Sequence, residues 1–464
     1  MKKALFRSLA IFFTLGMLCA CNNNDDNDPD PIVISEPDII DLAIANNELS
    51  VLLEALVQTD LVGTLQGNGP FTVFAPTNDA FETFLIENNY ASVLEIPLDV
   101  LSQVLLNHVV SGENFSSDLS TGYISSLSTA GAGGNNLSMF IDTTEGVSIN
   151  GDADVVDADN DATNGVVHIV NEVIGLPNIV DHAVANTDLS SLVAALTEGG
   201  NTTFTDLLSD TDVDFTVFAP VNSAFDAFTN PNGNELSNIL SNHVIVNTAA
   251  TSTALSNSYL NTAGTNADGD ALSIYVNTDS GVTLNGVSNV AAADIVATNG
   301  IIHAVDAVID IPTVVSFALA DPTFTPLVTA LTDTRLTTDF VSVLNGDGPF
   351  TVFAPTDTAF SNLLSDLMLN DISEIPEATL EAVLLHHVVS GQNIRTEDLN
   401  KPGDTPATTL EGDAITITFP PTEPNIANIT DGSQNTAGII DVNIQAGNGV
   451  IHVLNAVLLP DTNN

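Results

Sequence analysis

Basic side chains are almost missing from this chain. The 464 residues include 6 Lys and Arg against 59 Asp and Glu, and after Cys21 the only basic residues are Arg335, Arg395 and Lys401. From Cys21 onward, three positive charges against 59 negative ones give a formal net charge of −56. Such a surface repels phosphate backbones, which excludes nucleic acid as a partner. Docking on anionic lipid headgroups is disfavoured for the same reason, except through divalent cations.

Cysteine and tryptophan are scarce or missing as well. Both cysteines, Cys19 and Cys21, lie near the N-terminus, so the rest of the chain forms no disulfide and has to rely on packed cores. The chain has no Trp and only 4 Tyr, which is poor material for stacking against sugar rings. The hydrophobic share of 44% is nevertheless too high for a disordered chain.

Signatures of common enzymes do not occur in the sequence. There is no GxSxG, no HExxH and no phosphate-binding glycine loop, and no cysteine after Cys21 could act as a nucleophile. Acidic residues are abundant, so a pair of catalytic carboxylates is the enzymatic alternative that the sequence leaves open. We predict a protein that is not an enzyme.

The first 20 residues are typical of a secretory signal peptide. A basic start is followed by a mostly apolar run, residues 9–20, that is too short to remain in a bilayer as a spanning helix. The run ends in Leu18-Cys19-Ala20-Cys21, which resembles the lipobox of bacterial lipoproteins. The resemblance implies cleavage before Cys21 and a lipid on its thiol. The alternative is an ordinary signal peptide with two incidental cysteines.

Residues 21–37 are polar, acidic and punctuated by proline, which predicts a flexible tether. Acidic residues directly after a lipidated cysteine resemble a surface-export signal of Bacteroidetes-like bacteria, although a plain spacer would have the same composition. We therefore expect an outer-membrane lipoprotein that faces the cell surface or the periplasm, attached to the membrane by its lipid.

One motif of eleven residues occurs three times. It reads FTVFAPTNDAF from Phe71, FTVFAPVNSAF from Phe215 and FTVFAPTDTAF from Phe350. An HV element (LLNHVV, LSNHVI, LLHHVV) and then a strand-like motif (NGVVHIV, NGIIHAV, NGVIHVL) follow each copy. The copies begin 144 and 135 residues apart, far beyond the period of a solenoid repeat. We predict three tandem domains, residues 38–177, 178–312 and 313–460, each with its own core.

The motif itself predicts a strand, a stop and a helix start. FTVF is rich in strand formers, the proline ends the strand, and Thr77 can cap a helix by accepting a backbone N–H bond. Val221 replaces this threonine in the second copy, so Asn222 or Ser223 should cap instead, or the helix start should be weaker by about 1 kcal/mol. GVVHIV predicts a half-buried strand entered through an Asn-Gly turn with positive φ. Residues 49–61 predict an amphipathic helix.

The combination of FTVFAPTxxAF, an HV element and NGxxHxxxxVxxP resembles the fasciclin (FAS1) domain family over all three copies. The resemblance implies an α+β fold in which each domain is a compact β-sandwich with packed helices. It also implies a role in adhesion or scaffolding, with an extracellular-matrix component, a cell-surface protein or a glycan as partner. The alternative from a different class is a lipoprotein that captures polysaccharide or nutrients for an outer-membrane uptake system.

Six of the eight histidines recur at equivalent positions, as the pairs His108/His168, His243/His303 and His387/His452. Each pair could belong to a metal site, but no third ligand recurs with it, so packed histidines with backbone hydrogen bonds are the alternative. In the resembled family the HV element is associated with receptor contact, with a tyrosine before the histidine. Asn107, Asn242 and His386 take that place here, and we retain His108, His243 and His387 as candidate partner-binding residues.

Two acidic segments are further candidates. Asp157, Asp159 and Asp161 alternate along one stretch, which favours either a solvated acidic loop or weak Ca²⁺ binding; we expect no other cofactor. The EF-hand pattern fails there, because Ala162 and His168 occupy its glycine and glutamate positions. Asp294 and Ile295 of the second copy resemble the Asp-Ile element credited with integrin contact in animal members of the family. A structural turn is the alternative.

Overall fold

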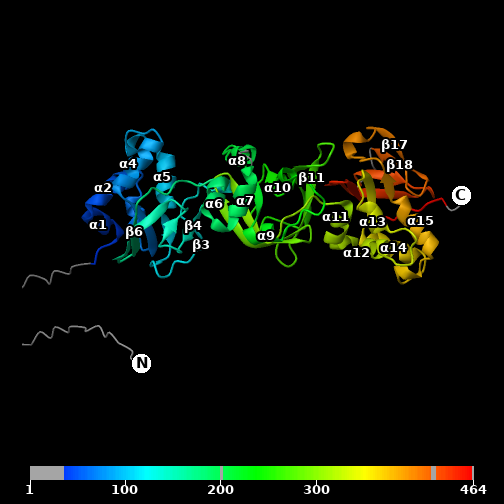
Figure 1. Ribbon diagram of the computed structural model, residues 1–464, viewed down its shortest axis with the longest axis horizontal. Coiled ribbons are helices and arrows are strands. Elements are labelled where there is room, and N and C mark those ends of the chain that lie inside the picture. Colours follow the sequence, from blue (N-terminus) through cyan, green and yellow to red (C-terminus); the bar gives the residue numbers. More distant parts are fainter. Residues whose placement is uncertain (1–35, 199–201, 420–424, 462–464) are drawn as a thin grey trace, which may run out of the picture.

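The computed structural model describes residues 36–198, 202–419 and 425–461. Three repeats of similar architecture follow one another along the long axis of the molecule, with the first and the third at opposite ends (Figure 1). The expected signal peptide (residues 1–20), the lipid-attachment residue Cys21 and nearly all of the expected tether (residues 21–37) lie outside the described residues.

Repeat one begins with helices and places most of its strands after them. Its helices are α1 (Ile39–Ala45), α2 (Ser50–Gln58), α3 (Val62–Leu65), α4 (Asn78–Glu87) and α5 (Leu98–Asn107), with 3₁₀ turns η1 (Asn47–Leu49), η2 (Val93–Glu95) and η3 (Ala132–Gly134). Its strands are β1 (Phe71–Pro76), β2 (Val109–Ser111), β3 (Gly122–Ser125), β4 (Ser138–Asp142), β5 (Ser148–Ile149), β6 (Ala153–Ala162) and β7 (Gly165–Val170).

Repeat two follows the same order, with its last two helices shorter than their counterparts in repeat one. Its helices are α6 (Ile179–Ala185), α7 (Ser190–Leu196), α8 (Thr203–Leu208), α9 (Asn222–Ala227) and α10 (Leu236–Ser241), with the 3₁₀ turn η4 (Thr187–Leu189). Its strands are β8 (Phe215–Pro220), β9 (Val244–Val246), β10 (Ser258–Thr265), β11 (Ala271–Asn277), β12 (Thr283–Leu284), β13 (Ser288–Ala297) and β14 (Gly300–Val305).

Repeat three restores the longer helices. They are α11 (Val314–Ala320), α12 (Thr325–Leu331), α13 (Phe340–Leu344), α14 (Asp357–Asp366) and α15 (Glu377–His386), with 3₁₀ turns η6 (Pro322–Phe324), η7 (Ile372–Glu374) and η8 (Thr396–Asp398). The strands are β15 (Phe350–Pro355), β16 (Val388–Ser390), β17 (Gly403–Thr408), β18 (Ala414–Phe419), β19 (Ala427–Thr430), β20 (Thr436–Ala446) and β21 (Gly449–Leu454).

Each repeat contains one seven-stranded sheet with the same strand order. In repeat one this order is β2-β1-β7-β6-β5-β4-β3, and the two repeated motifs, β1 and β7, pair as parallel neighbours. The sheet folds over on itself, because Leu127 N donates to Val109 O at 2.8 Å and so joins the chain after β3 to β2. One core lies between the folded halves of the sheet and another between the sheet and the helices. The expected α+β architecture is confirmed.

The strand of the second motif is more deeply buried than we expected. All six residues of β7 are buried, as are all six of β14 and of β21, so the prediction of a half-buried strand was wrong. The reason is that this strand has a core on both faces. Val167 and Ile169 pack toward the helices, whereas Val170 packs inside the folded sheet.

The Asn-Gly pair before this strand lies at the expected turn between β6 and β7, and Asn164 has a further role there. Asn164 is not in the left-handed region; its Oδ1 accepts from Ile39 N, and its Nδ2 donates to Leu65 O and Gly67 O. Asn299 and Asn448 make the same three bonds in the other repeats. A Cβ at Gly165 would overlap the Phe71 carbonyl of the neighbouring strand, so the glycine is needed for close approach of the two strands.

The predicted helix caps are confirmed in repeats one and three. The Thr77 hydroxyl accepts from Ala80 N at 3.2 Å, and Thr356 does the same with Ala359 N. Val221 has nearly the same backbone angles but no side-chain cap, and α9 has 6 residues where α4 has 10. Asn222 does not replace the cap, because its Oδ1 accepts from Ser191 N on α7. In the structure α9 therefore begins without a side-chain cap, and the weaker helix start stays a prediction.

The substitution Val221→Thr is expected to stabilise repeat two by about 0.5 to 1 kcal/mol, because the new hydroxyl would accept the Ala224 N–H. Urea unfolding followed by far-UV circular dichroism measures this change. Thr77→Val in repeat one is the matched control and should destabilise by a similar amount. Equal midpoints for Val221→Thr and the unmodified protein would contradict the capping argument.

Within the described residues, no single helix is long and apolar enough to cross a membrane; only α11 together with residues 322–331 passes on length and composition, and this pair is bent by 99°.

Candidate functional surfaces and the junctions between repeats

One histidine per repeat links the end of a helix to the loop after the last strand. At the end of α5, His108 Nδ1 donates to Val104 O at 2.7 Å and its Nε2 accepts from Ile174 N at 2.9 Å. His243 and His387 make the same two contacts in repeats two and three. All three rings are buried, and burial lowers the pKa of each to about 4. The rings are therefore neutral at pH 7 and act as structural links.

This placement matches the packing alternative for the three histidines. In each of the three rings both nitrogens already form hydrogen bonds with backbone groups, and none of the three side chains reaches the surface. Among the described residues, no group of three converging metal-ligating side chains includes any of these rings. Their role in partner binding stays a prediction; with this geometry, a partner would contact the exposed residues around them.

The second histidine of each pair supports a bulge in the neighbouring strand. His168 Nε2 donates to Asn114 O at 2.9 Å, and its Nδ1 accepts from Asp159 N at 3.2 Å. Asp159 is in the left-handed region at φ +63°, and both of its carboxylate oxygens accept hydrogen bonds from Ser116. These bonds lower the pKa of Asp159. The Asp159 carboxylate thus connects the loop after β2 to the bulge of β6 through these hydrogen bonds.

Asp294 and Ile295 occupy the same bulge in repeat two. Asp294 has φ +61° and accepts two hydrogen bonds from Ser252, and its side chain is 38% exposed. Ile295 is buried in the core that faces the helices. Asn443 takes this position in repeat three and binds Thr396. The receptor-contact prediction for Asp294 and Ile295 is untested, and in this geometry only Asp294 is available to a partner.

The acidic run of repeat one lies on β6, where Asp157, Asp159 and Asp161 are exposed. Asp161 pairs with the strand of the second motif at the position that Val296 and Gln445 occupy in the later repeats. Both of those residues contact the preceding repeat, whereas Asp161 faces solvent. The three carboxylates do not converge with one another in the described structure. Weak Ca²⁺ binding by this segment stays a prediction.

One group of potential ligands does converge, in repeat three. His386, Glu411 and Asp413 bring their ligand atoms within 4.8 Å of one another. Gly432 N donates to His386 Nε2 at 3.2 Å, so the proton of the neutral ring lies on Nδ1, which is 3.5 Å from Glu411 Oε2. A metal ion on Nδ1 would need the opposite tautomer, and Gly432 N would lose its acceptor. The arrangement therefore fits a hydrogen-bonded histidine better than a metal site.

The repeats are joined by two equivalent junctions. Ser138 of β4 accepts from Val296 N of repeat two at 2.9 Å, and Ser273 of β11 accepts from Gln445 N of repeat three at 2.9 Å. All four of these groups are buried. Equivalent strands, β4 and β11, thus meet equivalent strands of the next repeat, β13 and β20.

Tyrosines fill both junctions. The Tyr123 ring lies 5.6 Å from the His182 ring of repeat two. In the second junction Tyr259 packs edge-on against Phe317 at 5.4 Å and donates its hydroxyl to Asp321 Oδ2 at 3.0 Å. Tyr275 is 4% exposed and belongs to the hydrophobic core of repeat three. Each repeat contains core clusters of its own, and the core of repeat three also takes in Tyr275 and Tyr259 of repeat two.

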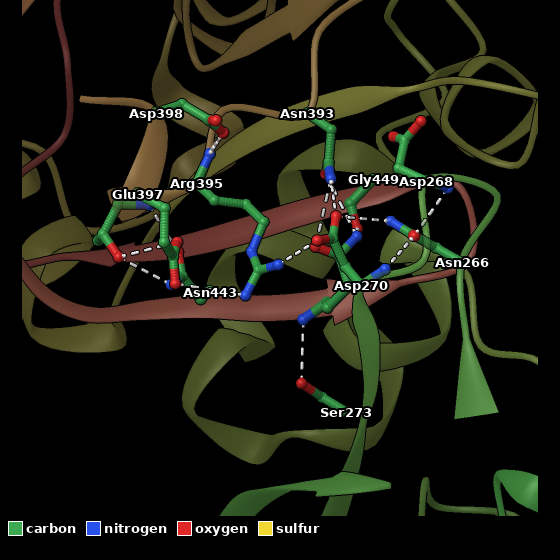
Figure 2. A network of polar contacts seen from close by, with 12 residues as sticks. Asn266, Asp268, Asp270, Ser273, Asn393, Arg395, Glu397, Asp398, Asn443 and Gly449 are labelled. Carbon is green, nitrogen blue, oxygen red and sulfur yellow. Dashed lines mark hydrogen bonds and ion pairs between the residues drawn. The ribbon is translucent and has the colours of Figure 1, made fainter. Parts of the chain in front are cut away.

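A charged network strengthens the second junction, as Figure 2 shows. Arg395 of repeat three forms an ion pair with Asp270 of repeat two, and Asn393 donates to the same carboxylate at 3.0 Å. Asn266 holds Asp270 from its own hairpin. Arg395 is one of the three basic residues after Cys21, so a rare positive charge is placed between two repeats.

The equivalent face of repeat three is polar. The cross-strand pair Tyr259 and Tyr275 of repeat two corresponds there to Asp404 and Thr418, which are hydrogen-bonded at 2.8 Å. With the exposed Asp161 at the opposite end, the outer faces of the first and third described repeats present polar side chains at positions that lie inside the internal junctions. Polar outer faces are what terminal repeats of an array need to remain soluble.

Our sequence reasoning missed these junction residues. One signal in the sequence was the scarcity of their residue types, because three of the 4 tyrosines and one of the few basic residues lie in the junctions. A second signal was the Leu-Ser pair, present as Leu137-Ser138 and Leu272-Ser273 but replaced by Ile415-Thr416 in repeat three.

Comparison with known proteins also divides the chain into three units. The fasciclin domain matches residues 47–177, 187–312 and 322–460. Human periostin is 30% identical over 344 residues, which is 70% of this chain and 37% of periostin. Rabbit transforming growth factor-beta-induced protein ig-h3 is 27% identical over 426 residues, 89% of this chain and 56% of that protein. The chain thus spans between about a third and about a half of these animal relatives.

A bacterial relative and a solved structure complete the comparison. Protein sll1483 of Synechocystis is 37% identical over 136 residues, 29% of this chain and 72% of that protein. The FAS1 domain pair from the insect cell adhesion molecule fasciclin I aligns with a TM-score of 0.39 and 20% identity, covering 57% of this chain and 97% of the pair. The three matched segments cover most of the sequence, and the chain therefore belongs to the fasciclin domain family, with three such domains in tandem.

Proposed function

We propose that this protein is a lipid-anchored adhesion or scaffolding protein of a bacterial cell envelope, which presents its three fasciclin domains as one rod. The observation that carries the proposal is the pair of equivalent buried junctions. They hold three related binding modules at fixed spacing and orientation, where a flexible chain would leave the modules independent. Membership of the fasciclin domain family, which this chain shares with the animal proteins periostin and ig-h3, supports the adhesive role.

Three modules at fixed spacing suit a target that is itself repeated. Binding of one module raises the effective concentration of the next, so tight attachment needs no tight single site. The surface of repeat three differs from that of the other two, for example where Asn443 takes the place of Asp159 and Asp294, so the modules need not share one ligand. Extracellular-matrix proteins, cell-surface proteins and glycans are all compatible classes of partner.

The charge and the aromatic content of the protein narrow the range of possible partners. With a formal net charge of −53 for the whole sequence, partners with basic surfaces, or contacts bridged by divalent cations, are favoured. Three of the 4 tyrosines are occupied in the junctions, which leaves little for stacking against sugars. This distribution supports a protein partner over a tightly bound glycan and weighs against polysaccharide capture.

Attachment of bacterial cells to a surface coated with extracellular-matrix protein tests the proposal. A strain without the protein should attach less, the unmodified gene should restore attachment, and Cys21→Ala should fail to restore it because the domains would lose their lipid. Immunoblots must show equal amounts of the unmodified and the Cys21→Ala protein. Unchanged attachment together with reduced uptake of a polysaccharide would contradict the proposal and favour the capture alternative.

A further inference from the structure

The core of repeat two contains a cavity that the other repeats nearly lack. It lies between α6, α7, α8 and the sheet and has a volume of about 90 Å³. Apolar side chains form almost all of its wall, among them Ile179, Ala183, Leu192, Val193, Val217 and Ile302. The corresponding cavity of repeat one, where Ala43 and Leu52 line the wall, has a volume of about 20 Å³.

Few polar groups line the cavity, and no side chain among its described wall residues has a free hydrogen-bond donor for water. The hydroxyls of Thr197 and Thr205 donate to Val193 O and Thr202 O of their own segments. The two ring nitrogens of His243 bind Ile239 O and Ile309 N. A water molecule in a cavity needs two to four polar partners, so this cavity favours an apolar occupant.

The cavity follows from the looser helical layer of repeat two. Phe340 of repeat three and Phe204 of repeat two occupy equivalent positions, each four residues before a leucine of the core. Phe340 is fully buried at the start of α13, whereas Phe204 is only half-buried. Phe81 and Phe360 are likewise buried, while Phe225 on the uncapped helix α9 is half-buried. One aromatic ring that is buried in both other repeats, and a second that is buried in repeat three, are therefore less deeply buried here.

We propose that repeat two binds a small apolar molecule in this cavity, such as a hydrocarbon of a few carbon atoms. An engineered protein cavity of about 150 Å³ with similar walls stays dry and binds benzene or xenon. The smaller volume here favours ligands at the xenon or short-hydrocarbon end of that range. This binding is separate from adhesion, because the site lies inside repeat two and all of its wall residues belong to that repeat.

Xenon is the probe for the test, with ¹²⁹Xe NMR of the mature chain as the readout. We expect a saturable chemical-shift change that corresponds to one site per chain. Ala183→Val reduces the cavity, so the shift change should fall severalfold, and Leu192→Phe should abolish it. The matched control is Ala43→Val, the same change at the equivalent wall position of repeat one, which should leave the xenon shift as it is.

The two alanine variants also separate a binding site from a general effect on packing. Ala183→Val adds methyl groups where there is space and should leave the unfolding midpoint of repeat two unchanged or higher. Ala43→Val adds them to a filled core and should lower the midpoint of repeat one. If Leu192→Phe does not fold, Ala183→Val decides the outcome. A xenon shift that does not saturate, or one that both alanine variants leave equal to the unmodified protein, would overturn the proposal.

Discussion

Replacing Tyr259 by alanine is expected to destabilise repeat three by about 3 kcal/mol, although Tyr259 belongs to repeat two. Its ring packs against Phe317 and lies 4.8 Å from the Tyr275 ring, so truncation leaves a void inside the second junction. Asp321, which is 6% exposed, also loses the hydroxyl donor at 3.0 Å. Burial and the Asp321 charge raise the pKa of Tyr259, in agreement with a neutral donor in a buried site.

Urea unfolding with hydrogen exchange resolved to β20 and β21 measures this loss. Tyr259→Phe keeps the ring and should lose only about 1 to 2 kcal/mol, the contribution of a hydrogen bond to a charged group. Tyr90→Ala is the control, since Tyr90 packs in repeat one and should change only that repeat. If exchange in repeat three were the same in Tyr259→Ala and the unmodified protein, the repeats would be independent and the shared core would be disproved.

Lowering the pH from 7 to 5 is expected to destabilise repeats two and three more than repeat one. Folding lowers the pKa of His182, His243, His387 and His452 to about 4 because they are buried, and in repeat one the same holds for His108. The unfolded chain therefore takes up protons first. The stability that these neutral, buried imidazoles contribute is fully present above pH 6.5. It falls as the pH is lowered and is lost near pH 4.

At pH 5 each of these imidazoles lowers the free energy of unfolding by about 2 kcal/mol compared with neutral pH. Repeats two and three, with two of these groups each, should lose about 4 kcal/mol, and repeat one about half as much. Most carboxylates stay ionised above pH 5, so histidine dominates this range. Burial raises the pKa of Asp181 and Asp441, which acts in the opposite direction at lower pH.

His182→Leu is the matched variant for this prediction. Leu42 occupies the equivalent position in repeat one, so leucine fits this helix face, and His182 Nδ1 has no hydrogen-bond partner. The variant should fold at pH 7 and lose about 2 kcal/mol less than the unmodified protein on going to pH 5. Thermal unfolding of both proteins at pH 7, 6 and 5 provides the comparison. Equal losses in the two proteins would contradict the histidine account.

The local structure of each repeat could be predicted because it depends on neighbouring residues. Thr77 caps a helix through a bond to Ala80 three residues away, and the FTVF strand ends at Pro76. The missing cap at Val221 could be predicted for the same reason. The pairing of motifs that recur together also indicated the family, and with it the α+β fold.

Features that depend on distant residues could not be predicted. Asn164 looked like a turn residue, yet its carboxamide binds Ile39, 125 positions earlier in the sequence. The junction bonds join Ser138 to Val296 and Ser273 to Gln445, across 158 and 172 positions. A serine in a strand has no local pattern that indicates such a partner. The histidines were ambiguous for the same reason, since their acceptors and donors belong to different segments.

The most direct test of the proposed surface display is digestion of intact cells with proteinase K, followed by immunoblotting, with Ca²⁺ present and then chelated. Trypsin is unsuitable because no Lys or Arg lies between Cys21 and Thr334. The purified protein should be digested in parallel to show that the folded domains are cleavable. Our account predicts rapid loss of the protein on unbroken cells while a periplasmic control remains intact. Protection until the outer membrane is permeabilised would contradict it and would place the three domains in the periplasm.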